Sequence, residues 1–259
     1  MHRRFPLAVL ALAAAAGSAL AQKSATQSIE EYRAMLADGN PADLFEAKGE
    51  ALWKQKRGPK NATLEQCDLG KGPGVVKGAF VELPRYFADT GKVQDLETRL
   101  VTCMERLQGF DGHQIARTPF GRGEQANLTA LATWVAAESK GLPFNLPQSH
   151  PQEKVAYEAG KRLFFMRAGP HDFSCASCHG QDDKRIRLQD LPNLTKNPGD
   201  GVGFAAWPAY RVSNGQMWSM QLRVAVGHVQ ERHVAVGRHL VQLLGGGGRV
   251  GFRPAAQAE

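Results

Sequence analysis

The stretch Cys175-Ala176-Ser177-Cys178-His179 limits what this chain can fold into, because it holds two of only four cysteines in 259 residues. Two thiols at this spacing on one helical turn can form thioethers to the vinyl groups of a haem, and His179 can then reach iron as the proximal ligand. A zinc site would need a second ligand pair, and a thioredoxin-like redox pair would not need the histidine. The motif therefore predicts one covalent haem c.

The first residues predict export. Residues 1–21 have a basic start at Arg3 and Arg4, an apolar run from Leu7 to Ala16, and a small-x-small cleavage site at Ala19-Leu20-Ala21. These are the parts of a secretory signal peptide. The apolar run is short for a membrane span, and no later segment is long and apolar enough to be one. We expect a periplasmic protein without a membrane span, in a compartment that permits disulfides and haem attachment.

The mature chain is mildly basic. Removal of Arg3 and Arg4 lowers the net charge from +7 to +5. This suits an anionic small molecule or an acidic protein partner. The basic residues near Lys184 are too few and too scattered to indicate a nucleic-acid partner.

An internal repeat links the haem motif to an earlier segment. Without a gap, the segment ending at Cys67 matches the segment ending at Cys178. The identical positions are Gly49 with Gly160, Leu52 with Leu163, Gly58-Pro59 with Gly169-Pro170, and Cys67 with Cys178. In the first copy Leu64 replaces the first haem cysteine, and Asp68 replaces the ligand histidine. The first copy therefore resembles a haem site that has lost a thioether and its iron ligand.

A second pair of segments repeats in the same order along the chain. The segment "LPRYFADTGKVQDLETRLVTC" ends at Cys103, and "WPAYRVSNGQMWSMQLRVAVG" ends at Gly227. The matched positions are Pro84 with Pro208, Tyr86 with Tyr210, Gly91 with Gly215, and Arg99 with Arg223. Chance similarity is the alternative for either match alone, and two collinear matches make it a weaker explanation.

Apolar spacing and capping signals predict a mainly α fold. The expected helices span 28–39, with a capping box of Ser28 and Glu31, 95–108, 128–141 and 153–165. Trp134, Phe164 and Phe165 are expected in the core. Prolines within 141–152 predict a linker between two tandem cytochrome c-like domains. Their expected bounds are 22–145 for the haemless domain and 146–259 for the haem-binding one, whose tail after about 222 is atypical.

The two remaining cysteines lie at Cys67 and Cys103, both in the first copy. In an oxidising compartment they are expected to form a disulfide that fastens the domain without haem, with two free thiols as the alternative. In the chain-entropy model such a loop stabilises by about 3–4 kcal/mol.

The segments "LEQCDLGKGPGVVKGAF", "LPRYFADTGKVQDLETRLVTC" and "CASCHG" resemble the SoxA subunits of the SoxAX cytochrome, an L-cysteine S-thiosulfotransferase of periplasmic sulfur oxidation. The similarity runs from about Ile29 to Gln221, and it is to the single-haem type, whose first domain carries a disulfide. The resemblance implies a heterodimer with a SoxX-type cytochrome. It also implies that thiosulfate is joined to a cysteine of the carrier SoxYZ while two electrons leave through haem.

The resemblance also implies a distal iron ligand that this chain lacks. In the family a cysteine, often a persulfide, follows an arginine by four residues; here the arginine is Arg223 and the cysteine position is Gly227. Arg223 is expected to bind the sulfonate oxygens of the substrate.

Two explanations of Gly227 stay open. In the first, the iron takes His228, Met217 or Met220 as its distal ligand, or its distal position has no protein ligand. The protein is then an electron carrier or an inactive subunit. Alternatively, the reading frame changes shortly after Arg223, since a GTG-CAG junction encoding Val229-Gln230 contains the cysteine codon TGC in another frame. His150, His171, His233 and His239 are expected to be incidental.

Overall fold

The computed structural model of the chain describes residues 39–167, 172–186, 189–195 and 205–230, together with Glu31 and Ala34; the side chains of 189 and 226–230 are not described. The chain divides into two compact units, Met1–Asn40 and Pro41–Glu259. The predicted signal peptide lies outside the described residues. Of the helix predicted over 28–39, Glu31 and Ala34 are helical. Across the described part of the chain, no helix has the length and apolarity to cross a membrane.

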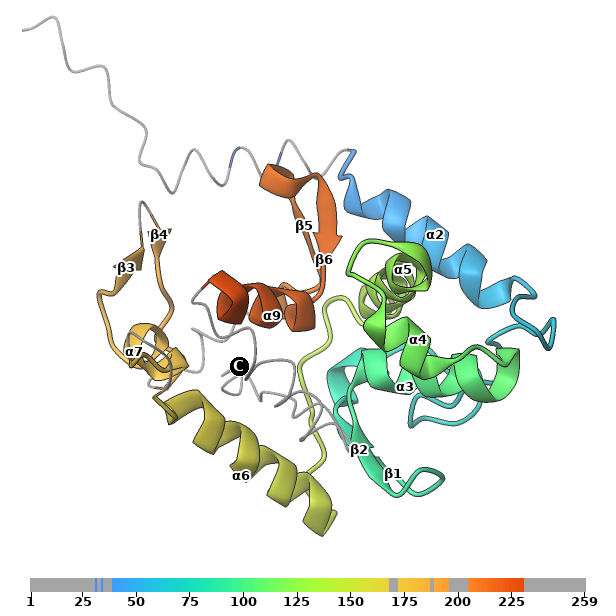
Figure 1. Cartoon of the computed structure of the whole chain (residues 1–259), viewed down its shortest axis with the longest axis horizontal. Coiled ribbons are helices and arrows are strands. Elements are labelled where there is room, and N and C mark those ends of the chain that lie inside the picture. Colours follow the sequence, from blue (N-terminus) through green and yellow to red (C-terminus); the bar gives the residue numbers. More distant parts are fainter. Residues whose placement is uncertain are drawn as a thin grey trace, which may run out of the picture. The chain divides into compact units, whose positions relative to one another are not determined.

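The first half of the unit Pro41–Glu259 is built from helices with one short hairpin at their edge (Figure 1). Most of its buried apolar side chains form one cluster, and α2 and α5 cross so closely that a Cβ at Gly49 would lie 2.2 Å from the Ala130 carbonyl oxygen. The elements are α2 (Ala42–Lys54), η1 (Phe80–Glu82), β1 (Arg85–Phe87), β2 (Lys92–Gln94), α3 (Leu96–Cys103), the π-helical turn η2 (Met104–Gln108), α4 (Gly112–Arg117) and α5 (Gly123–Ala137).

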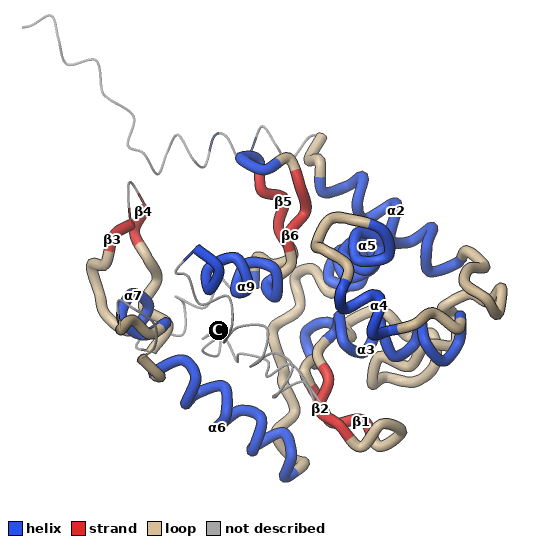
Figure 2. The backbone as a smooth tube through the Cα atoms, in the orientation of Figure 1, coloured by secondary structure: helices blue, strands red, loops and turns tan. Residues whose placement is uncertain are grey.

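The described part of the second half has two short hairpins and carries the haem motif on its own short helix. Figure 2 shows that helices and loops predominate over strands in both halves. This confirms the predicted mainly helical fold. The elements are α6 (Pro151–Phe165), α7 (Cys175–His179), β3 (Arg185–Ile186), β4 (Gln189–Asp190), β5 (Ala209–Arg211), η4 (Val212–Asn214), β6 (Gln216–Trp218) and α9 (Met220–Gln230).

The second sequence repeat has a structural counterpart. Hairpin β1–β2 pairs Tyr86 with Val93, and hairpin β5–β6 pairs Tyr210 with Met217, so the matched tyrosines occupy the same register position. Each hairpin is preceded by a cis X-Pro bond, and each is followed by a helix, α3 or α9. Gly91 and Gly215 both adopt positive φ, at +66° and +61°, which glycine tolerates without steric cost. Chance similarity does not account for this agreement.

The first sequence repeat is reproduced only in part. Helices α2 and α6 carry the matched Gly49 and Gly160, and both glycines are buried. The residues that match α7, however, form a turn in the first half rather than a helix. Asp68 explains the difference, because its Oδ1 accepts from the backbone N–H groups of Gly70 and Gly72, at 2.7 and 2.9 Å. Such local side-chain bonds give the backbone an alternative to helix.

The helix predictions hold with small changes at the ends. Asp95 caps α3 by accepting from the Thr98 N–H at 2.8 Å, as its position ahead of an apolar pattern indicates. Helix α5 begins earlier than predicted and ends before Gly141. Phe164 is buried as expected, but Phe165 is 52% exposed, so its expected place in the core was wrong.

The predicted linker is extended and anchored. Residues 142–149 contain no helix or strand, and the Asn145 N–H donates to the Val81 carbonyl at 2.9 Å. Pro151 already belongs to α6, which His150 caps by accepting from the Gln152 N–H at 3.2 Å. His150 is therefore not incidental, since its ring also stacks on Tyr86 with centroids 3.6 Å apart.

Each half contacts a helix of the other half through one of its hairpins. Hairpin β1–β2 of the first half packs on α6 of the second, where Glu153 accepts from the Tyr86 N–H at 2.8 Å. Hairpin β5–β6 of the second half reaches α2 of the first, where Tyr210 lies 6.2 Å from Phe45 between ring centroids. The matched tyrosines thus each contact the first helix of the opposite half.

Candidate functional site

The haem motif forms the short helix α7, and serines fix its start. Ser174 and Ser177 make a reciprocal capping box, in which the side chain of each accepts from the backbone N–H of the other. Cys175 is exposed, Cys178 is partly buried, and neither belongs to a disulfide. The cap sets the first turn of α7, and both thiols project from that one turn.

His179 at the end of α7 is oriented by the loop that follows. Its Nδ1 lies 3.1 Å from the Pro192 carbonyl oxygen, and its own carbonyl accepts from the Leu194 N–H at 2.8 Å. With Nδ1–H donating to that oxygen, Nε2 keeps its lone pair for a metal. Asn193, which is buried, donates to Asp182 at 2.8 Å and holds the loop in place.

The residues around the motif fit a covalently attached haem. Two thiols on one turn and an imidazole directly after the second are the donor set that haem c requires. Large apolar side chains flank the motif in the sequence and are partly exposed, namely Phe165, Met166 and Phe173. Among the residues that the structure describes, no cluster of three or more His, Cys, Asp and Glu could hold a metal ion.

Helix α9 carries the predicted substrate arginine. Ser219 caps it by accepting from the Leu222 N–H at 3.2 Å, and Arg223 is exposed on its first turns. Met217 is buried in β6, and Met220 is partly buried at the start of α9. Gly227 and His228 belong to α9, but side chains from 226 onward lie outside the described part, so the distal ligand stays a prediction.

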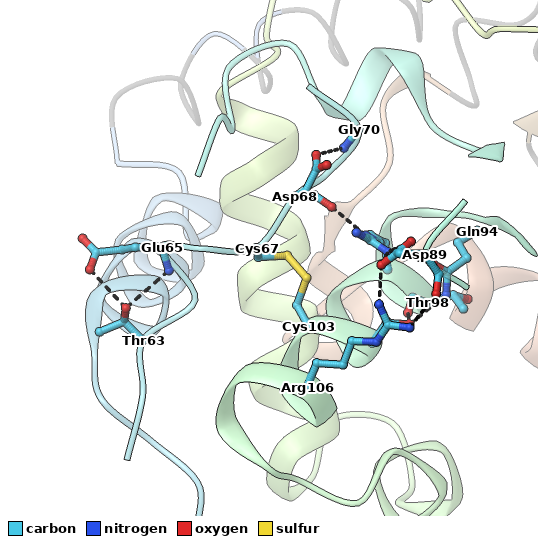
Figure 3. The surroundings of a disulfide bond; sticks show 12 residues. Thr63, Glu65, Cys67, Asp68, Gly70, Asp89, Gln94, Thr98, Cys103 and Arg106 are labelled. Carbon is cyan, nitrogen blue, oxygen red and sulfur yellow. Dashed lines mark hydrogen bonds and ion pairs between the residues drawn. A yellow bond between two sulfur atoms is a disulfide. The ribbon is translucent and has the colours of Figure 1, made fainter. Parts of the chain in front are cut away.

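The first half holds a disulfide where the second half holds the haem motif. Cys67 and Cys103 are joined, with Cα atoms 5.5 Å apart, and both are buried (Figure 3). The predicted pairing is therefore present in the structure. By the two sequence matches, the bond connects the counterparts of Cys178 and Gly227.

Arg99, the counterpart of Arg223, has a structural role. It is 4% exposed, and its Nε donates to the Asp68 carbonyl at 2.6 Å. Its Nη1 donates to both oxygens of Asp89 at 2.9 Å, and its guanidinium lies 4.0 Å from the centre of the Phe87 ring. Arg99 therefore ties the disulfide segment to the hairpin.

A pocket of about 530 Å³ opens beside the disulfide. Arg85, Arg99 and Arg106 line it, but each is already paired within the first half: Arg85 with the Gly70 carbonyl, and both others with Asp89. The sequence did not predict the role of Asp89 in pairing these arginines, because its partners depend on how the hairpin folds over α3.

One contact between the halves was also missed. Gln221 Nε2 in α9 donates to Asp95 Oδ2 at 2.7 Å. The two residues lie 126 positions apart, and no local sequence pattern pairs them.

This fold and this site define a mainly helical protein of the cytochrome c class. Residues 48–144 match the family described as "SoxA/TsdA, cytochrome c domain", and this stretch is the half without the haem motif. The chain is 57% identical over 198 residues to the L-cysteine S-thiosulfotransferase subunit SoxA of Hydrogenophilus thermoluteolus, covering 76% of this chain and 72% of that one. The chain belongs to the family of SoxA subunits of L-cysteine S-thiosulfotransferase.

More distant relatives agree with this assignment. The SoxA subunit of Hydrogenobacter thermophilus is 34% identical over 185 residues, covering 71% of this chain and 66% of its own. The crystal structure of SoxXA from P. pantotrophus matches with a TM-score of 0.58 at 23% identity, covering 74% of this chain and 66% of that one. This structural likeness supports the fold.

Proposed function

We propose that the chain is a periplasmic subunit that joins thiosulfate oxidatively to a carrier-protein cysteine of the SoxYZ type, with a SoxX-type cytochrome as its partner. The carrier thiol and thiosulfate form a new S–S bond, and one proton and two electrons leave. The orientation of His179 by the Pro192 carbonyl is the observation that supports this proposal most strongly, because it leaves Nε2 available to an iron at the CASCH turn.

Cys175 and Cys178 would hold the haem by thioethers, and His179 would bind its iron. When bound, haem c would accept one electron at a time, so the two electrons of the oxidation would leave through this haem and partly through the SoxX-type cytochrome. Phe165, Met166 and Phe173, which flank the motif in the sequence and are exposed, would offer the porphyrin apolar contacts. Mass spectrometry of the exported protein should show the mass of one haem, and the double variant Cys175→Ser, Cys178→Ser should lack both this mass and the Soret band.

The guanidinium of Arg223 would bind the thiosulfate dianion at the sulfonate oxygens of the ligand. A guanidinium offers paired donors that match an oxyanion in geometry, and it remains charged at every relevant pH. Its position on an exposed part of α9 leaves it accessible to a small ligand. The same charge would also favour the anionic form of a sulfur group close by.

The first half is proposed to be a cytochrome c-like domain that has lost its haem. It has the hairpin register and following helix of the second half, and a disulfide at the matched positions. It thus provides a rigid support for the haem half. The predicted domains of 22–145 and 146–259 meet in the extended segment before α6.

The decisive test is thiosulfate-dependent cytochrome reduction with a SoxX-type partner and a SoxYZ-type carrier. Wild type should reduce its haem only when both thiosulfate and the carrier are present. Arg223→Met should lower kcat/KM at least a hundredfold, since it removes the substrate charge partner. Arg117→Met is the matched control, because Arg117 is exposed on α4 of the first half. Equal loss in both variants would refute the role of Arg223.

Gly227 favours a second function, that of an electron carrier or inactive partner subunit. Glycine offers iron no ligand and thiosulfate no sulfur nucleophile. If Gly227 is genuine, wild type should be inactive in the assay while still binding the partner, and Gly227→Cys should gain activity. Resequencing the locus separates this function from a frame change after Arg223, because a frame change would place other codons there.

A further inference from the structure

The carboxylate of Asp95 contacts two helices that belong to opposite halves. Its Oδ1 accepts from the Thr98 N–H at 2.8 Å and so caps α3. Its Oδ2 accepts from Gln221 Nε2 of α9 at 2.7 Å. Asp95 is 6% exposed, so both bonds are shielded from water. A shielded bond to a charged acceptor is stronger than one between neutral groups.

These contacts fix the first turn of α9. Ser219, which is 2% exposed, caps the helix, and the side chain of Leu222 in the first turn is buried. Gln221 adds the only described side-chain hydrogen bond that this turn makes to the first half. At 3.6 residues per turn, Gln221 and Arg223 lie about 200° apart around the helix axis. Arg223 therefore points away from the side of α9 that Asp95 holds.

We propose that Asp95 is a positioning residue, which acts through Gln221 to set the rotation of α9 and thereby the direction of Arg223. The inference rests on the proposed function of Arg223 as the substrate cation. It also gives the first half a specific role, because Asp95, which caps α3, is the residue that holds α9 through Gln221. A rotation of α9 by even part of a turn would displace a guanidinium at the end of a long side chain by ångströms, and such misplacement is costly for reaction rate.

The variant Asp95→Ser isolates this contact. Serine is as good an N-cap as aspartate, so α3 keeps its cap, but the shorter side chain cannot reach Gln221. Gln221→Leu removes the contact from the other side with little change in volume. Asp95→Asn is the conservative variant: asparagine can still cap α3, and its amide can pair with the amide of Gln221. Gln114→Leu, at an exposed position of α4, is the control.

Hydrogen–deuterium exchange of the haem-loaded protein measures the anchoring directly. Asp95→Ser and Gln221→Leu should each speed exchange of the α9 amides about tenfold, with α3 amides unchanged, and the double variant should be no faster than either single one. Asp95→Asn and Gln114→Leu should match wild type. Unchanged α9 exchange, or effects that add in the double variant, would overturn the proposal.

Kinetics measures the consequence for Arg223. In the thiosulfate assay the same two variants should raise KM for thiosulfate or lower kcat by about tenfold, and either variant combined with Arg223→Met should cost no more than Arg223→Met alone. Normal kinetics alongside faster α9 exchange would overturn the link to Arg223. If wild type shows no thiosulfate activity, the proposed function fails, and thiosulfate affinity measured by calorimetry replaces the kinetic readout: equal affinity in wild type and Asp95→Ser would again overturn the link.

Discussion

Removal of the Cys67–Cys103 disulfide should destabilise the first half strongly without affecting the haem. The bond closes a loop with a sequence separation of 36. In the chain-entropy model, a loop of this length raises the free energy of unfolding by about 4 kcal/mol at 25 °C. For a chain of this size, such a loss lowers Tm by about 10 °C. It is also a large share of the roughly 5–15 kcal/mol that natural domains have in total.

The single variants Cys67→Ala and Cys103→Ala sharpen this test. Each alone breaks the bond, so each should lose about as much stability as the double variant, and the coupling energy of the cycle should approach the full 4 kcal/mol. Leu44→Ala is the control, because Leu44 is 75% exposed on α2 and should change stability by less than about 0.5 kcal/mol.

Urea unfolding followed by two probes measures the effect. Trp53 and Trp134 pack together in the core of the first half, with ring centroids 5.4 Å apart. Part of the tryptophan fluorescence therefore follows the unfolding of this half. Soret absorbance follows the haem half separately. The fluorescence transition should move to lower urea while the native Soret spectrum stays unchanged. A loss below 1 kcal/mol in the double variant, or losses that add between the single variants, would refute the reasoning.

Three further changes test the packing and charge of the first half. Gly49→Ala should cost about 1–3 kcal/mol in urea unfolding, because its Cβ would lie 2.2 Å from the Ala130 carbonyl oxygen, whereas Lys48→Ala on the exposed side of α2 should cost little. Arg99→Met should cost about 2 kcal/mol by the same measurement, since it leaves the Asp68 carbonyl and Asp89 without this partner. Burial, followed by the charge of Asp43, raises the pKa of Glu46 above 4.5, so the fold disfavours its ionised form. Glu46→Gln should therefore raise Tm at pH 7, and the gain should vanish as the pH falls below 4.5, where wild-type Glu46 is protonated in both states.

Local patterns account for the parts of the structure that the sequence predicts well. Helices α3 and α6 follow from apolar spacing with Asp95 and Pro151 near their starts, because capping acts over three or four residues. The disulfide follows from cysteine count and compartment. The turn at Asp68 was not predicted, because it depends on the carboxylate bonding to the backbone of its own loop.

Contacts between distant segments are the part that sequence patterns do not contain. Asp89 pairs with Arg99 only because hairpin β1–β2 folds back over α3. His150 stacks on Tyr86, and Gln221 reaches Asp95 across 126 positions of sequence. No periodicity or motif encodes such pairs, because they depend on how the two halves dock. The repeat comes closest to encoding them, since it shows which positions in the two halves are equivalent.

That equivalence gives Gly227 a counterpart in the first half. Hairpins β1–β2 and β5–β6 share one register, and α3 and α9 begin at matched capping residues. In the first half the position eight residues after the cap is Cys103, and it bonds to the counterpart of Cys178. The first half thus forms its disulfide between the counterparts of Cys178 and Gly227, and under the proposed function these two positions are a thioether cysteine and the place of the distal ligand.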